Sequence, residues 1–414
     1  MENKDSVNGK NGIASMIQID AKSTMEQSYM YNDNGSLSEI FKSSYKHHTK
    51  FDKELCVLTS DTSPNWGSSV VYNFDVRKCE MICNLVLHFN LGELPYGYVW
   101  ENGTAYSLID TISIINGDDE IVRYSGHYLF TQFVLNTKKS KQIGTNVMTG
   151  YHNSKYSLHG GPLELYLDIP FMSTLLDKQY YPLFISSNAT FQIRVKFRPL
   201  QEVILQTSDS ENVDVTLNVQ HNGKVRVLMK SDKNITVEPT LRAELFYDAI
   251  HLTQEERMLY VNSKKHTLLY YKVQEIQEYI QASENIKNCL LDFSGTVSHL
   301  IVTLQLPNKS TDFLPIDTFT LILNGIVIGA TNTNAKTFMY YNHNLSIPSK
   351  HVYVIPFGLS CIQTQPSGTY TFHGKHNSLL VVKRNDSTFT CKITISSVIQ
   401  SRLEFENGCI HCVL

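Results

Sequence analysis

The sequence is poor in the features that mark nucleic-acid-binding, secreted and membrane proteins. Charged residues make up 18% of the 414 residues, the formal net charge is −3, and lysine and arginine form no dense run. Such a chain has no positive field to hold a phosphate backbone, so direct binding to nucleic acid is not expected. The N-terminus lacks the order of a signal peptide, and no apolar stretch approaches the ~20 residues of a membrane-spanning helix. We expect a soluble protein made in the cytosol.

The sequence motifs of common enzymes are missing as well. The chain contains no Gly-x-Ser-x-Gly elbow, no phosphate-binding loop pattern and no His-Glu-x-x-His helix. We therefore predict that the protein is not an enzyme, and we assign no catalytic residue, no cofactor-binding residue and no metal ligand.

The cysteines are spread along the chain, unlike the dense framework of a small secreted domain. They are Cys56, Cys79, Cys83, Cys289, Cys361, Cys391, Cys409 and Cys412. Reduced thiols in a reducing compartment fit this distribution best. One alternative stays open, because the pairs Cys79/Cys83 and Cys409/Cys412 supply four thiols for one zinc ion. Against it, Cys83 falls in an alternating stretch that turns its side chain toward a core.

The sequence is rich in β-strand patterns. Hydrophobic residues make up 42% of the chain and aromatic residues 11%. From Cys83 to Leu91, and again from Phe191 to Phe197, apolar side chains occupy every second position. A period of two predicts a strand with one face in a core. Because the chain exceeds the usual size of a single core, we expect two domains of roughly 200 residues each.

Two segments about half a chain apart resemble one another. Ile109-Asp110-Thr111 leads through an apolar run to Asn116-Gly117, and Ile316-Asp317-Thr318 leads through a similar run to Asn324-Gly325. Asn-Gly is the pair that best tolerates the positive φ angles of a tight hairpin. Similarity at this distance predicts two domains of the same fold in tandem. Chance similarity is the alternative, since Asn-Gly hairpins are common.

Helices are expected only as short inserts between strands. Residues 126–137 have the pattern of one amphipathic helix, and Thr253-Gln254-Glu255-Glu256 has the spacing of a capping box. Residues 138–161 are predicted to form a polar loop. Each half of the chain then contains about eight short strands, which is typical of a two-sheet sandwich closed by Greek-key connections.

Three segments carry a resemblance to a known family. Residues 353–381 contain two alternating runs that flank the turn Gln365-Pro366-Ser367-Gly368; Glu255-Glu256-Arg257 opens a short helix; and residues 195–200 read Val-Lys-Phe-Arg-Pro-Leu. These segments resemble the major capsid proteins of nucleocytoplasmic large DNA viruses, such as iridoviruses, phycodnaviruses and mimiviruses. The chain departs from that family at Met258, where a second arginine is usual, and at Thr371-Phe372-His373, where Asn-Phe-Ser is usual.

The resemblance implies an all-β fold of the double jelly-roll type, that is, two tandem eight-stranded antiparallel sandwiches with short helical inserts. We expect a disordered N-terminal arm at residues 1–35, whose polar composition buries too little apolar surface to order it. A first jelly roll is expected at 36–205, a linker or loop at 206–238, and a second jelly roll at 239–414.

The resemblance also implies a structural function. The chain would form pseudo-hexagonal homotrimers that tile an icosahedral shell, in contact with minor capsid proteins and an internal membrane but not directly with nucleic acid. It would reside in the virion capsid, and in the host cytoplasm during assembly. The residues that carry the structural motifs are Asn116, Gly117, Asn324, Gly325, Arg257, Pro366, Ser367 and Gly368.

Two other functions compete with this hypothesis. The first is a scaffold or minor capsid protein of the same fold. The second is a β-sandwich carbohydrate-binding protein, suggested by 23 tyrosines. A carbohydrate-binding protein needs aromatic platforms on an exposed face, whereas many of these tyrosines fall at alternating strand positions that bury them.

Overall fold

The computed structural model describes residues 51–413, with gaps at 76, 96–97, 138, 152–159, 172–179, 187–189, 207–237, 263–264, 308–310, 332–350, 360–366, 374–377, 385–387 and 407–408. The predicted N-terminal arm, nearly all of the predicted 206–238 loop, and Pro366 lie outside the described residues.

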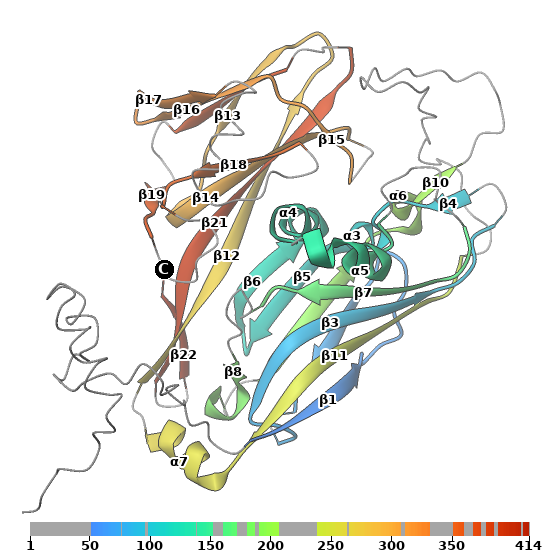
Figure 1. The fold of residues 1–414 in the computed structure, drawn as a ribbon, viewed down its shortest axis with the longest axis vertical. Coiled ribbons are helices and arrows are strands. Elements are labelled where there is room, and N and C mark those ends of the chain that lie inside the picture. The colour runs from blue at the N-terminus through green and yellow to red at the C-terminus, as the bar shows by residue number, and fades with distance from the viewer. Residues whose placement is uncertain are drawn as a thin grey trace, which may run out of the picture. The chain divides into compact units, whose positions relative to one another are not determined.

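Two antiparallel sheets form the first sandwich (Figure 1). The larger sheet has the strand order β1-β11-β3-β7, and β8 also pairs with β3. The smaller sheet has the order β2-β9-β5-β6. The strands are β1 (Phe51–Thr59), β2 (Ser69–Asn73), β3 (Met81–Leu91), β5 (Ile109–Asn116), β6 (Asp119–Ser125), β7 (Leu163–Ile169), β8 (Tyr181–Pro182), β9 (Phe191–Phe197) and β11 (Leu241–Leu252), with a separate ribbon of β4 (Tyr98–Trp100) and β10 (Ile204–Gln206).

The second sandwich is built in the same way. Its larger sheet has the order β12-β21-β14-β15, to which β18, β19 and β22 add, and its smaller sheet has the order β13-β20-β16-β17. The strands are β12 (Lys265–Ile280), β13 (Ile286–Leu290), β14 (Ser294–Gln305), β15 (Phe313–Leu314), β16 (Thr318–Leu323), β17 (Ile326–Thr331), β18 (Val352–Pro356), β19 (Tyr370–His373), β20 (Leu379–Lys383), β21 (Cys391–Glu406) and β22 (Cys409–Val413).

The two sandwiches share one topology. In both large sheets the first strand pairs with a long strand near the end of the sandwich, that strand pairs with the third, and the third pairs with a later one: β1-β11-β3-β7 corresponds to β12-β21-β14-β18, and only the second sandwich adds a further strand, β22, beside β21. In both small sheets the order is again the same. Two packed sheets of four main strands, connected in this order, make a jelly roll. The predicted double jelly roll with short helical inserts is therefore confirmed.

The pairing of β11 differs from the predicted boundary between the domains. The expectation was that residue 239 begins the second jelly roll, yet β11 lies between β1 and β3 and completes the large sheet of the first. In this topology the last strand of a sandwich returns to lie beside the first, so a strand that follows a long connection still belongs to the earlier sandwich. We propose that the two domains divide at α7 (Gln254–Asn262).

Helices occupy the connections between strands. They are α3 (Thr104–Ser107), α4 (Gly126–Asn136), α5 (Lys139–Thr149), α6 (Leu200–Val203) and α7, with the 3-10 helix η2 (Leu183–Ser186). The predicted helix at 126–137 is α4, whose first turn is capped where the Ser125 hydroxyl accepts the Tyr128 N–H at 3.0 Å. The predicted capping box begins α7, since the Glu256 N–H donates to the Thr253 hydroxyl at 3.4 Å. The predicted polar loop at 138–161 is wrong in part, because α5 fills much of it.

The two Asn-Gly hairpins differ by one position. Asn324 and Gly325 form the turn as predicted, with φ of 51° and 78° between the paired residues Leu323 and Ile326. In the first hairpin Asn116 still pairs with Asp119, so Gly117 and Asp118 form the turn. Asn116 is only 8% exposed, which keeps it in the strand. The prediction that Asn116 lies in the turn is therefore wrong by one residue.

The glycine that begins α4 has no room for a side chain. A Cβ atom on Gly126 would lie 2.3 Å from the Tyr106 carbonyl oxygen and 2.4 Å from that of Ile109. Gly144, in the middle of α5, has no atom of the described residues within 4 Å of a Cβ position.

We predict that Gly126→Ala lowers the free energy of unfolding by about 1–3 kcal/mol, because the backbone must move to relieve the overlap. The matched variant Gly144→Ala is expected to raise it by up to about 1 kcal/mol through helix propensity. Urea unfolding followed by circular dichroism measures both. Equal stabilities of the two variants would contradict the predicted difference.

Candidate functional site

The first sandwich packs against the outer face of the second sandwich's large sheet. Phe313 of β15 lies with its ring centroid 5.5 Å from that of Phe130 in α4 and 5.5 Å from that of His127. Ile301 of β14 and Val398 of β21 belong to the same hydrophobic cluster as the core of the first sandwich. Alternate residues of these strands form the second sandwich's own core, so both faces of β14 and β21 are covered. We call this contact the seam.

Polar groups in the seam are paired across it. His127 Nε2 lies 2.9 Å from the Thr303 hydroxyl, and the Thr311 hydroxyl donates to the Asn102 carbonyl oxygen at 3.0 Å. Burial lowers the pKa of His127 to about 3, and burial raises the pKa of Glu275, a β12 residue whose carboxylate accepts the Ser396 hydroxyl at 2.9 Å. Both shifts disfavour charge, as expected where water is excluded.

Sequence reasoning missed the seam, although a signal was present. The run Leu300-Ile301-Val302 is apolar at three consecutive positions. Three such positions in a strand indicate that both of its faces are buried, in contrast to strict alternation.

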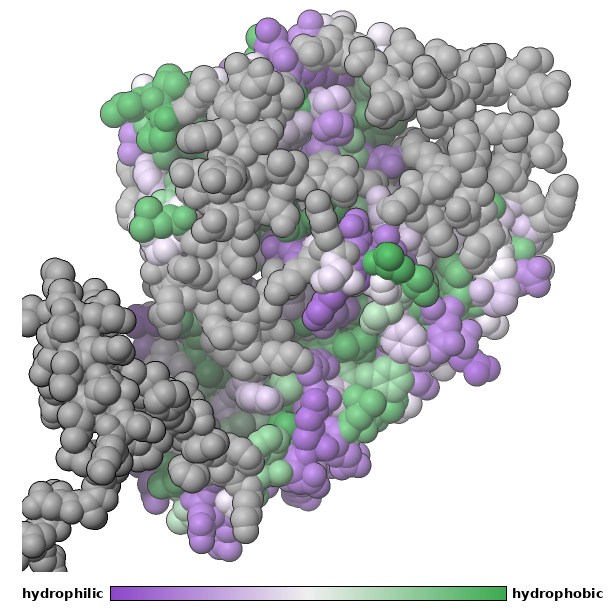
Figure 2. Space-filling view, viewed as in Figure 1, coloured by the Kyte–Doolittle hydropathy of each residue, from purple (hydrophilic) through white to green (hydrophobic). Residues whose placement is uncertain are grey.

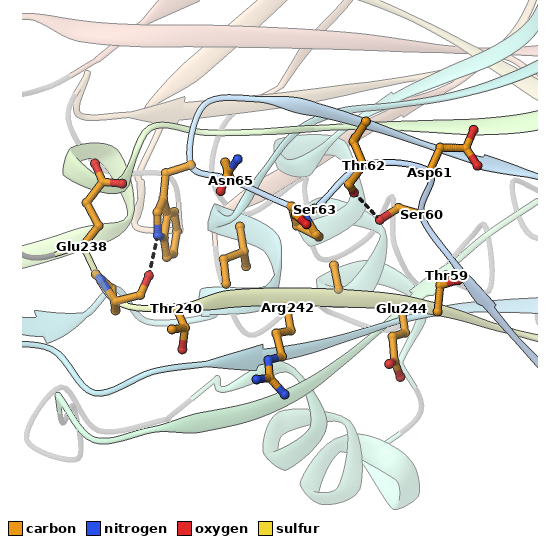
Figure 3. Close-up of a pocket in the computed structure, with 15 residues that line it drawn as sticks. Thr59, Ser60, Asp61, Thr62, Ser63, Asn65, Glu238, Thr240, Arg242 and Glu244 are labelled. Atoms are coloured by element: carbon orange, nitrogen blue, oxygen red, sulfur yellow. Dashed lines mark hydrogen bonds between the residues drawn. The ribbon is translucent and has the colours of Figure 1, made fainter.

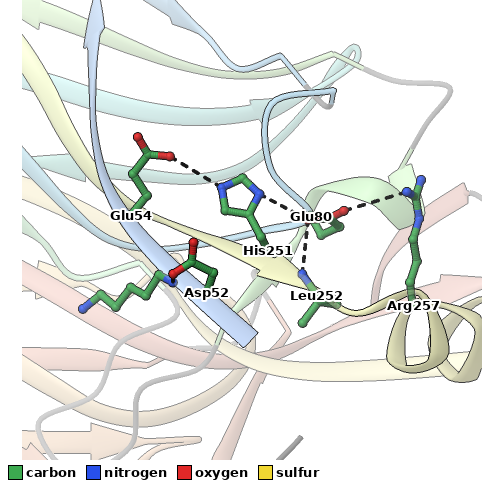
Figure 4. A network of polar contacts seen from close by, with 7 residues as sticks. Asp52, Glu54, Glu80, His251, Leu252 and Arg257 are labelled. Atoms are coloured by element: carbon green, nitrogen blue, oxygen red, sulfur yellow. Dashed lines mark hydrogen bonds and ion pairs between the residues drawn. The ribbon is translucent and has the colours of Figure 1, made fainter. Parts of the chain in front are cut away.

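Arg257, one of the predicted motif residues, belongs to a polar network at the start of α7 (Figure 4). Its Nη1 lies 3.8 Å from Glu80 Oε1, while His251 lies 3.6 Å from the other oxygen of Glu80 and 3.7 Å from Glu54. Glu80 also accepts the Leu252 N–H at 3.4 Å. The network joins β1, β11 and α7. Its separations are long and its members partly exposed, so each ion pair contributes less than about 1 kcal/mol.

Ser367 and Gly368, the described half of the predicted corner, lie against Gly358. The Leu359 N–H donates to the Ser367 carbonyl oxygen at 3.4 Å. A Cβ atom on Gly358 would lie 2.7 Å from the Gly368 carbonyl oxygen, and Gly368 has a φ of 145°. Both glycines are needed for this close approach of two backbones.

The predicted motif residues do not converge on one site. Asn324 donates from its side-chain amide to the Tyr370 hydroxyl at 3.2 Å, at the end of the second sandwich's small sheet. Asn116 and Gly117 lie at the corresponding end of the first small sheet, and Arg257 lies at α7. Their shared role as structural motifs stays a prediction.

A groove of about 650 Å³ lies between residues 59–66 and 238–244 (Figure 3). Its lining is largely polar and includes Glu238, Arg242 and Glu244. The aromatic ring in it belongs to Trp66, which donates its indole N–H to the Pro239 carbonyl oxygen at 2.9 Å and stacks on Trp100. These contacts hold the ring inward, so the groove lacks the exposed aromatic platform that a carbohydrate-binding site needs.

The outer face of the first sandwich's large sheet is partly apolar. Phe246, His88 and Tyr166 form an aromatic cluster on neighbouring strands, with His88 centred 4.7 Å from Tyr166 and 5.4 Å from Phe246. Beside them on β1, Leu55 is 67% exposed and Val57 51% exposed. We call these five residues the outer patch.

Metal-binding clusters and membrane-spanning helices are both absent from the described residues. In that part of the chain no group of three or more His, Cys, Asp and Glu side chains is placed to hold a metal ion. None of the described helices is long and apolar enough to cross a membrane. Of the cysteines, Cys56, Cys79, Cys83, Cys289 and Cys391 are free thiols.

Known structures share this fold. The PBCV-1 protein VP54, in a crystal structure fitted into a reconstruction of the virophage Sputnik, has a TM-score of 0.73 and 16% identity over 91% of this chain and 100% of its own. The Faustovirus major capsid protein has a TM-score of 0.65 and 10% identity, over 95% and 97% of the two chains. The mavirus major capsid protein has a TM-score of 0.53 and 9% identity, over 92% and 94%. A search of curated proteins by sequence gives no match.

Part of the sequence also matches a family profile. The profile of a family described as "Major capsid protein N-terminus" matches residues 39–230, which include most of the first sandwich. The fold is therefore that of a double jelly-roll protein. Among proteins with this fold, the profile match points to the viral major capsid proteins. Residues 39–230 thus match the N-terminal part of the viral major capsid protein family, and the whole chain has the double jelly-roll fold of the capsid proteins named above. Its role is structural rather than enzymatic, and its place is the capsid of a virus particle.

The buried histidines predict how stability depends on pH. Burial lowers the pKa of His127 to about 3 and that of His299, a β14 residue, to about 4. Below the ordinary pKa of 6.5 the unfolded chain binds protons that the folded chain does not bind. The stability contributed by neutral burial is thus complete above pH 6.5 and is lost as the pH falls toward 3 or 4.

We predict that each histidine lowers the free energy of unfolding by up to about 1.4 kcal/mol per pH unit within this window. His127→Gln, which keeps a side-chain amide to pair with Thr303, removes about one such contribution, and His127→Gln/His299→Gln removes both. Urea midpoints measured between pH 4 and pH 7 report the slopes. A double variant with the slope of the wild type would contradict the assignment.

Proposed function

We propose that three copies of this chain associate around a threefold axis to form a pseudo-hexagonal capsomer, and that these capsomers tile an icosahedral shell. The observation that carries the proposal is the repetition of one topology in the chain. Three chains then supply six similar sandwiches. A ring of six similar lobes has a nearly hexagonal outline, and hexagons tile a flat facet.

The seam supports the proposal because it makes each chain a single block. Its contacts fix the second sandwich on the first through α4, β12 and β14, with apolar and paired polar groups. A rigid block of two sandwiches has a defined angle between them, and a closed ring needs such an angle. Subunits that meet through unlike surfaces close into a ring when the rotation is right.

The proposal of partners other than further copies of this chain is based on the resemblance to the family. We include contacts with minor capsid proteins and an internal membrane, and assembly in the host cytoplasm, in the same proposal. The net charge of −3 supports the view that the chain does not bind the genome directly.

We predict that the purified protein has three times the 47.2 kDa mass of the chain. Size-exclusion chromatography with multi-angle light scattering measures this mass, and negative-stain images should show six lobes. A monomer that stays monomeric at tens of micromolar concentration would count against the proposal. Mass spectrometry of mature particles separates a major shell protein, which should be the dominant species, from a scaffold or minor protein of the same fold.

A further inference from the structure

The two large sheets can be aligned residue by residue because both carry a β-bulge at the same place. In the first sandwich the register shifts on the N-terminal side of Val86 in β3, which pairs with Phe246. In the second it shifts on the N-terminal side of His299 in β14, which pairs with Val398. A bulge breaks the ladder at a defined point, so it marks equivalent positions.

The ladders then extend this correspondence across both sheets. Phe246 pairs with Val57, as Val398 pairs with Val273. Two residues beyond the bulge pair, His88 faces Tyr166, as Ile301 faces Val354. The outer-patch residues Val57, Phe246, His88 and Tyr166 therefore correspond to Val273, Val398, Ile301 and Val354.

The four residues of the second sandwich are all buried in the seam. Their exposed fractions are 9% for Val273, 2% for Val398, 1% for Ile301 and 5% for Val354, and all four belong to the cluster shared with the first sandwich. Among the described residues, their counterparts in the first sandwich have no such cover. Val57 is 51% exposed, and Leu55, which corresponds to Tyr271, is 67% exposed.

The surroundings of the outer patch resemble the margin of a protein interface. Glu164 lies 3.0 Å from His88 Nε2 and accepts the Tyr166 hydroxyl at 2.8 Å, with its side chain 59% exposed. Glu244 lies 3.7 Å from His88 Nδ1 on the other side. An aromatic and aliphatic centre with a charged rim is the usual composition of such surfaces. Figure 2 shows hydrophobic and hydrophilic side chains side by side over the lower right, where Figure 1 places β1, β3 and β11.

The second sandwich also has an exposed apolar edge, at β17. Within the chain, β6 of the first sandwich lies against β12 of the second. The strand that corresponds to β6 is β17, where Ile326, Val327 and Ile328 are 68%, 60% and 59% exposed. They form a hydrophobic patch at the upper left of Figure 2, where Figure 1 labels β17.

We propose that the outer patch is the docking surface for the second sandwich of another copy of this chain, which approaches with its β17 edge. The contact repeats between chains the packing that the seam makes within one chain. It joins unlike surfaces head to tail, so repetition closes a ring. This inference rests on the proposed trimer and adds which faces of the chain build it.

Single substitutions in the outer patch test the inference on the full-length protein. Leu55→Asp and Val57→Asp place a charge on the outer face and leave the inner core of the sheet unchanged. Each is expected to raise the dissociation constant of the trimer by about a hundredfold or more, because the carboxylate would be buried without a partner. Ile286→Asp is the matched control, since Ile286 is an equally exposed apolar residue, at 56%, on β13 at the opposite edge of the small sheet from β17.

Analytical ultracentrifugation measures the dissociation constants, and circular dichroism with urea midpoints verifies that each variant folds. Monomeric Leu55→Asp and Val57→Asp beside a trimeric control support the inference. Stable trimers of both patch variants overturn it and leave the proposed trimer standing, whereas a monomeric wild type overturns the proposed trimer itself. Val327→Asp is expected to dissociate as the patch variants do, and a stable trimer of this variant would overturn the assignment of β17 to the contact.

Discussion

The burial of one sheet on both faces is the constraint on which the rest of the structure depends. β14 and β21 lie between the core of their own sandwich and α4 of the other. A titratable side chain on either face of such a sheet must be neutral or must form a pair with another polar group. The neutral imidazole of His127 pairs with the Thr303 hydroxyl, and the Ser396 hydroxyl donates to the Glu275 carboxylate, so these groups meet that requirement. Without the first sandwich, the seam residues on the outer face of this sheet would be exposed to water.

This constraint gives the two halves different surfaces although they share a topology. The covered sheet uses aliphatic residues such as Val273 and Ile301. The equivalent sheet of the first sandwich uses Phe246, His88 and Tyr166, with carboxylates around them. Rings with polar edges tolerate contact with water and still bury a large area when covered. The first sheet is thus suited to a surface that is exposed in one state of the protein and covered in another.

Much of the fold could be predicted from the sequence because strand periodicity and turn chemistry are local. The alternation around Leu87 and Ile193 predicted β3 and β9, and the repeated Ile-Asp-Thr segments predicted the tandem arrangement that the shared topology confirms. The assignment of β11 failed because chain order does not report spatial order when the last strand of a sandwich returns to the first.

The sites were harder to predict than the fold, since they depend on contacts between distant segments. Nothing near His127 in the sequence indicates that its partner is Thr303, 176 residues away. The first hairpin turn lies one residue after its predicted position, because burial of the Asn116 side chain outweighs the turn preference of Asn-Gly. Of the motif residues, Asn324 and Gly325 formed the expected turn, and no described atom lies within 4 Å of a Cβ position on Gly325.

In each sandwich the first strand lies beside a long strand near the end: β1 pairs with β11, and β12 pairs with β21, which only the short strand β22 follows. Each sandwich therefore receives the chain and releases it along one border, and α7 needs only nine residues to lead from one unit to the next. No hydrogen-bonded ladder crosses this junction among the described strands. A gene divided at this junction would encode two halves that each retain a complete set of strand partners, and a duplicated single-sandwich gene would need only a short new segment to become this chain.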